Sequence, residues 1–66
     1  MIMEIGIIAG DIWHYLDENQ GTAKLADIMD ALSASREDIF MSLGWLAREG
    51  HVVIERKEDY RITLRK

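Results

Sequence analysis

The sequence contains no cysteine and no long run of apolar residues. Without thiols, the fold cannot use disulfides or thiolate metal sites. A membrane-spanning helix needs about 20 consecutive apolar residues, and no stretch approaches that length. Residues 1–4 also lack the basic flank of a secretory signal, so we expect a cytoplasmic protein.

Histidine is scarce too, and His14 and His51 are the only two. Neither has a second histidine or a carboxylate pair at the spacing of metal ligands. The five glycines form no phosphate-binding loop, and Gly6 and Gly10 are better explained by close approach of another helix. We therefore expect no enzymatic activity, no metal and no other cofactor.

A chain of 66 residues has room for one domain, which we place over residues 1–66. Such a chain buries only roughly 60% of its unfolded surface, which leaves no room for a deep catalytic cleft. Since 48% of the residues are hydrophobic, stability must come from a compact core or from a partner.

Basic charge is nearly absent from the first half of the chain. Residues 1–35 carry six acidic side chains and Lys24 as the only base, whereas residues 36–66 carry seven bases and six acids. The net charge of −4 argues against unspecific binding of nucleic acid, because phosphate binding is driven by lysine and arginine. A surface for phosphate must therefore be built from the second half.

The first helix is predicted over about residues 3–17. Its core-facing residues share one side of the helix: Ile5, Ile8, Ala9, Ile12 and Leu16. Ile7 falls on the opposite side, so the helix is apolar more than halfway round. This surplus suggests self-association, with a homodimer formed through this helix.

Residues 18–21 carry turn chemistry, and Asn19 and Gly21 can both adopt positive φ. The next two residues, 22–23, form either a one-bridge strand or the start of a helix. A second helix is predicted over about 24–32 from Leu25, Ile28, Met29 and Leu32. The connection over residues 33–35 is short enough for a helix-turn-helix.

The third helix is the best-marked element, over about residues 35–49. Ser35 can cap its first turn, and Asp38 resembles the acidic partner of a capping box. Gly50 can take the left-handed conformation that ends helices. The residues predicted to face the core are Ile39, Phe40, Leu43, Leu46 and Ala47.

Beyond residue 50 the period changes to two, which predicts a β-hairpin. One face of the hairpin carries the apolar residues Val52, Ile54, Tyr60, Ile62 and Leu64. Residues 56–59 form its charged tip. Three helices followed by a two- or three-stranded sheet account for the whole chain, so the expected fold class is mostly α with a β-hairpin.

The segment LGWLAREGHV, residues 43–52, resembles the junction between recognition helix and wing in winged helix-turn-helix domains. Its Gly-Trp pair and the small size of the chain are similar to a family of small stand-alone winged helix-turn-helix proteins from archaea and bacteria, whose function is largely uncharacterised. The resemblance implies double-stranded DNA as partner, with helix 35–49 in the major groove and the 55–61 hairpin tip on the backbone. It also implies a role in transcription regulation, often as a homodimer.

For such a DNA-binding protein, the candidate contacts lie on the third helix and the hairpin. They are Ser35, Arg36, Arg48, Arg56, Lys57 and Arg61. Glu37 and Asp38 oppose this interpretation, because carboxylates at the start of a recognition helix repel phosphates. Solvated surface arginines are the alternative explanation.

Met41 and Trp45 lie four residues apart on the outward side of the same helix. Trp45 either packs against the wing strands, anchors a protein partner or second subunit, or stacks in a DNA groove. The alternative function is therefore a protein-interaction module without nucleic-acid binding, which uses Met41, Trp45 and Ile7 as its apolar contacts.

Overall fold

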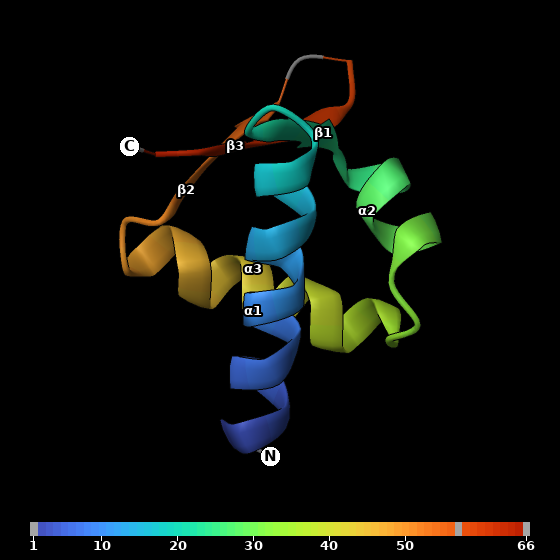
Figure 1. Ribbon diagram of the computed structural model, residues 1–66, viewed down its shortest axis with the longest axis vertical. Helices are drawn as coiled ribbons and strands as arrows, with labels where there is room; N and C mark the ends of the chain where they lie inside the picture. The colour runs from blue at the N-terminus through green and yellow to red at the C-terminus, as the bar shows by residue number, and fades with distance from the viewer. Residues whose placement is uncertain (1, 57, 66) are drawn as a thin grey trace.

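The computed structural model describes residues 2–56 and 58–65, and for residues 2–5 it describes the backbone alone. The elements follow in the order α1 (Ile2–Glu18), β1 (Thr22–Lys24), α2 (Leu25–Ala31), α3 (Arg36–Arg48), β2 (Val52–Arg56) and β3 (Tyr60–Leu64). In Figure 1, α1 crosses α3, while α2 and the sheet lie at one end of the molecule. This arrangement confirms the predicted fold class.

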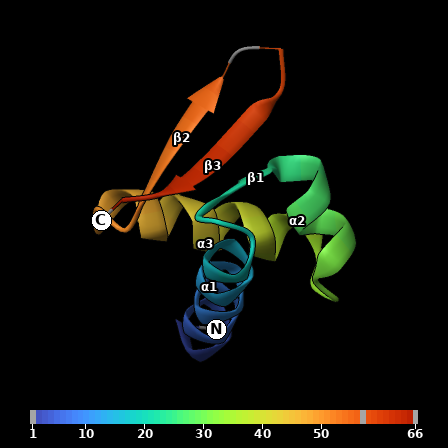
Figure 2. The same ribbon diagram turned by 45° about the horizontal axis from the view of Figure 1, so that its top comes forward.

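The sheet is antiparallel with the strand order β1-β3-β2. β3 pairs with β2 through Val52↔Leu64 and Ile54↔Ile62, and it pairs with β1 through Ala23↔Ile62. Of the two possibilities for residues 22–23, the strand is therefore correct. Figure 2 shows the β2-β3 hairpin extending away from the helices, with β1 between it and α2.

The core lies between the three helices and the base of the hairpin. Its buried residues come from every element: Ala9, Ile12, Leu16, Ala23, Ile28, Ile39, Leu43, Leu46, Val52, Ile62 and Leu64. The side chain of Ile5, which was predicted to face this core, lies outside the described side chains. Apart from Ile5 and Phe40, the predicted stripes of α1, α2 and α3 meet in one cluster, as helices with one apolar side require.

Short local signals end α1 and α3. After α1, Gln20 and Gly21 have φ of 66° and 82°, and the side chain of Asn19 donates to the Tyr15 carbonyl. Gln20 therefore takes the left-handed position expected for Asn19. After α3, Gly50 has a φ of 79°, and the N–H groups of Gly50 and His51 donate to Ala47 and Leu46. This pair of bonds is the Schellman motif, so Gly50 ends α3 as predicted.

Candidate nucleic-acid interface

The start of α3 is held by a side-chain cap. The Ser35 hydroxyl accepts a hydrogen bond from the Asp38 N–H at 3.1 Å, which confirms the predicted cap. Glu37 and Asp38 occupy the first turn, where the helix dipole favours carboxylates. The cap places Arg36 at the first helical position, with an exposed side chain.

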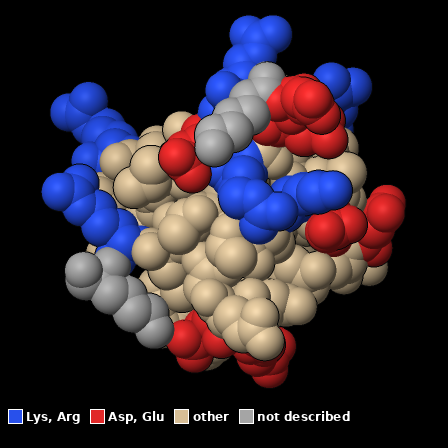
Figure 3. Space-filling model, turned by 90° about the horizontal axis from the view of Figure 1, so that it is seen from above, with Lys and Arg blue, Asp and Glu red and all other residues tan. Residues whose placement is uncertain are grey.

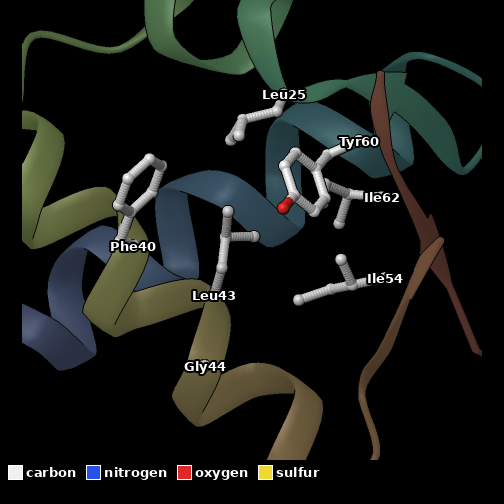
Figure 4. Close-up of a pocket in the computed structure, with 7 residues that line it drawn as sticks. All are labelled: Leu25, Phe40, Leu43, Gly44, Ile54, Tyr60 and Ile62. Atoms are coloured by element: carbon white, nitrogen blue, oxygen red, sulfur yellow. The ribbon is translucent and has the colours of Figure 1, made fainter. Parts of the chain in front are cut away.

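An apolar groove separates α3 from the outer half of the hairpin. Its volume is about 290 Å³. The lining residues are Leu25 from α2, Phe40, Leu43 and Gly44 from α3, and Ile54, Tyr60 and Ile62 from the hairpin. In Figure 4 the hairpin side chains point toward α3 across an open space. We call this feature the α3–hairpin groove.

The groove exists because the hairpin leaves the core along its length. The five apolar residues predicted for one face of the hairpin share that face in the observed register. At the base, Val52 and Leu64 are buried, whereas Tyr60 in the outermost pair is 43% exposed. In the middle pair, Ile62 on the central strand is 1% exposed and Ile54 on the edge strand is 40% exposed. Phe40 on the facing helix is 41% exposed, so its predicted place in the core is wrong.

Two of the predicted arginines border this groove. The Arg36 guanidinium carbon lies 5.2 Å from the centre of the Phe40 ring, and that of Arg56 lies 5.6 Å from the centre of the Tyr60 ring. Since both rings line the groove, the two cations stand on its opposite sides. A cation over an aromatic face gains about 0.5–1 kcal/mol at an exposed site, which favours these positions over free solvation.

Arg61 lies on the other face of the hairpin, because it alternates with Tyr60 and Ile62. Its Nη1 donates to the Thr22 hydroxyl at 3.0 Å, and that hydroxyl lies 3.2 Å from the Thr63 hydroxyl. This network joins β1 to β3. Arg61 therefore has a structural contact and is separated from the groove.

Of the two remaining predicted cations, Arg48 has a described position. Arg48 is exposed in the last turn of α3, at the opposite end from Arg36. Lys57 lies outside the described residues. The structure therefore brings together Arg36 and Arg56, but not Arg48 or Arg61.

Acidic side chains accompany the bases at the hairpin end of the molecule. A second hollow there is lined by Lys24, Glu55, Glu58, Asp59, Tyr60 and Arg61. Figure 3 shows blue and red side chains next to one another over this end. The local charge is therefore mixed, and the cations that border the apolar groove differ from their neighbours by their contact with aromatic rings.

Trp45 occupies the other side of α3. Its side chain is 46% exposed, and its ring centre lies 6.2 Å from that of His51. It lines a hollow of about 230 Å³ together with Gly6, Ala9, Gly10, Trp13, Leu46 and His51. We call this the α1–α3 hollow. Trp45 thus packs toward α1 and the residue before β2, while Met41 is 45% exposed.

Ile7 is 61% exposed, more than the other large hydrophobic residues whose side chains are described. Gly6 and Gly10 do not accommodate another helix of this chain, because a Cβ at either would meet no atom within 4 Å. Their predicted role in close packing therefore stays a prediction about another molecule. Among the described residues, no three histidines or carboxylates lie together as metal ligands.

Phe40, Gly44, Ile54 and Tyr60 are the site residues that the sequence argument missed. The i, i+4, i+8 spacing of Arg36, Phe40 and Gly44 was a usable signal, because it places all three along one side of a helix. For the hairpin, the alternation of Ile54 with Glu55 only indicates a face. It does not indicate where that face leaves the core.

Comparison with known families gives one match. The family model described as "Winged helix-turn-helix domain (DUF2582)" matches residues 1–65. No curated protein and no solved structure matches the chain. In the part of the chain that the structure describes, none of the helices has the length and apolar character needed to cross a membrane.

Proposed function

We propose that this chain, which belongs to the DUF2582 family of winged helix-turn-helix domains, binds duplex DNA as a transcription regulator. The observation that carries the proposal is the pair of arginines on the two sides of the α3–hairpin groove. Arg36 lies at the start of α3 and Arg56 at the outer end of β2, so one belongs to each DNA-contacting element of a winged helix.

In this proposal, α3 enters the major groove and the hairpin contacts the backbone. Arg36 reaches a base edge or a phosphate, and Arg56 reaches a phosphate of the same duplex. Ser35 adds its hydroxyl near the helix N-terminus. Glu37, in the same turn of α3 as Arg36, repels phosphates and so weakens this contact. Arg48, Lys57 and Arg61 then contribute a weaker electrostatic attraction.

Salt dependence tests the proposal. Fluorescence anisotropy with a labelled mixed-sequence duplex should give an affinity that falls steeply as salt rises. The slope of log affinity against log salt should decrease by about 0.9 for each phosphate contact removed by Arg36→Ala or Arg56→Ala. Arg65→Ala is the matched control, because it removes the same charge beyond the other end of β3.

Absence of duplex binding by the folded protein at low salt would contradict the proposal. So would an equal loss of slope in all three variants, since that would indicate an effect of net charge alone.

A second candidate function, protein interaction through the outward side of α3, is favoured by the half-exposed Trp45 and Met41. In this case Trp45→Ala should abolish partner capture while the protein stays folded.

We also propose a homodimer formed through α1. The exposed Ile7 and the open positions at Gly6 and Gly10 support it.

A further inference from the structure

The lining of the α3–hairpin groove is chemically unlike a phosphate site. Its residues are aliphatic or aromatic apart from the glycine, and the Tyr60 hydroxyl is their only polar side-chain group. Phe40, Ile54 and Tyr60 each expose about two fifths of their surface. Exposed apolar side chains gathered around a groove mark interaction sites. Inside the groove, a phosphate between the two arginines would find the Tyr60 hydroxyl as the only side-chain donor among the lining residues.

Gly44 keeps one side of the groove open. A Cβ added there would meet no atom within 4 Å, so no contact inside the chain requires glycine. Glycine within a helix is less favourable than alanine. The position is therefore accessible to a side chain that arrives from outside.

The volume and the lining favour a protein side chain over a metabolite. Small-molecule pockets are usually about 300–1,000 Å³ and contain several placed polar groups. This groove is at the lower limit of that range and has no polar group besides the Tyr60 hydroxyl. It is suited to one apolar anchor presented by a peptide backbone.

The charged residues beside the groove determine which charge a bound peptide segment should carry. Arg36 and Arg56 lie over the two rings at the border of the groove. Glu55 is adjacent to Arg56 in sequence, but in the β2-β3 register it lies opposite Arg61. Its side chain is therefore on the same face of the hairpin as that of Arg61, opposite the face that lines the groove. Glu37 follows Arg36 in the first turn of α3, three residues before Phe40 and seven before Gly44, so it lies along the side of the helix that borders the groove. Of the described charged side chains, Arg36 and Arg56 are the two that lie over rings lining the groove, so we take them as the partners for carboxylates of an inserted segment.

We propose that the α3–hairpin groove binds an acidic amphipathic segment of a partner protein. One aliphatic or aromatic side chain inserts between Phe40, Gly44 and Tyr60, and flanking carboxylates pair with Arg36 and Arg56. This is recognition of an amphipathic segment in an apolar groove, with charge complementarity setting its orientation. Because the same arginines serve both ligands, the segment displaces DNA. This competition, unlike the binding itself, rests on the proposed function.

Selection from a displayed library of short amphipathic peptides, with acidic, neutral and basic flanks, tests the inference. The full chain is the bait, and Gly44→Leu is the blocked bait. We expect enriched peptides to carry one large apolar residue between Asp or Glu residues. Their affinity should fall by about tenfold or more in Gly44→Leu and in Arg36→Ala/Arg56→Ala, as expected for loss of an anchor pocket or of its charges.

Gly10→Leu is the matched control, because Gly10 is also a helix glycine with no atom within 4 Å of an added Cβ. It lines the α1–α3 hollow and should bind the selected peptides like the wild type. A second measurement needs no variant. Amide chemical-shift changes in the wild-type protein should be centred on Phe40, Gly44 and Tyr60 rather than on Trp45.

Several outcomes overturn the inference: no enrichment over the blocked bait, enrichment of basic or neutral flanks, or shift changes centred on the α1–α3 hollow. Dimerisation that Gly44→Leu abolishes, in the absence of peptide binding, would assign the groove to a second copy instead. Peptide binding without any duplex binding would support the groove and refute the proposed function. Simultaneous binding of peptide and duplex would refute the competition.

Discussion

The α3–hairpin groove and the α1–α3 hollow lie on two sides of the same helix and share several properties. Both are apolar, and both contain half-exposed aromatic side chains and a helix glycine with an open Cβ position. They differ in charge. Arginines lie over the rings of the groove, whereas the Trp45 ring in the hollow lies beside His51.

This difference separates two kinds of partner. An apolar surface bordered by cations favours anionic ligands, while an apolar surface without them favours another apolar surface. We therefore assign DNA and the acidic segment to the groove, and subunit contacts to the α1 side. Four sets of variants test this division.

The core residues beneath the α3–hairpin groove and the α1–α3 hollow should contribute equally to the free energy of unfolding. Leu43 lines the groove and Leu46 lines the hollow, and they are 4% and 2% exposed. Each replacement by alanine should lower the free energy of unfolding by about 2–5 kcal/mol. Urea unfolding measures this loss. Leu43→Met and Leu46→Met conserve volume and should cost less than about 1.5 kcal/mol. A small loss for Leu43→Ala alone would show that the base of the groove is not core.

Self-association should depend on the exposed side of α1, which carries Ile7, and not on the α3–hairpin groove. Ile7→Glu places a charge on the most exposed of the described large hydrophobic residues and should weaken a dimer by about tenfold or more. Sedimentation equilibrium measures the dimer, and Tyr60→Ser provides the control on the groove side. A monomeric wild type at high concentration, or equal loss in both variants, would contradict the division.

DNA affinity should depend on the groove side. Phe40→Ala removes the ring under the Arg36 guanidinium and should weaken duplex binding about two- to fivefold, corresponding to about 0.5–1 kcal/mol. Trp45→Ala should leave duplex affinity unchanged. Anisotropy titrations at one fixed salt concentration compare the two variants. Equal losses would place the duplex across both sides of α3.

The smallest effect is a gain in stability. Gly10→Ala and Gly44→Ala should each raise the free energy of unfolding by roughly 0.5–1 kcal/mol, because alanine is a better helix former and both Cβ positions are open. Thermal unfolding measures this gain. A gain at only one of the two positions would show that the other position has no room for a Cβ, and would distinguish the α3–hairpin groove from the α1–α3 hollow.

Several features could be predicted from the sequence because they depend on near neighbours. Ser35 caps α3 through the N–H three residues on, and Gly50 ends the helix because it accepts a positive φ. The alternation of Val52, Ile54 and their partners determines the shared face of the hairpin. The side of α1 that carries Ile7 follows from the period of the helix.

The site depends on longer-range geometry. The sequence identified Arg36 and Arg56 together with Arg48 and Arg61, without a way to separate them. The separation comes from register and packing: Arg56 pairs with Tyr60, and Arg61 is bound to Thr22 on the other face. For Trp45, the crossing of α1 and α3 places the half-exposed ring at the α1–α3 hollow, and the protein and DNA contacts considered for it stay predictions.

The sequence by itself therefore determined the elements, their ends and the faces they bury. Only the tertiary structure decided that Phe40 is exposed and that it faces Tyr60, twenty residues farther along the chain, across an open groove. The physical reason is that capping, φ preference and periodicity act over a few residues. The divergence of the hairpin from α3 follows from how three helices and a sheet pack on one small core.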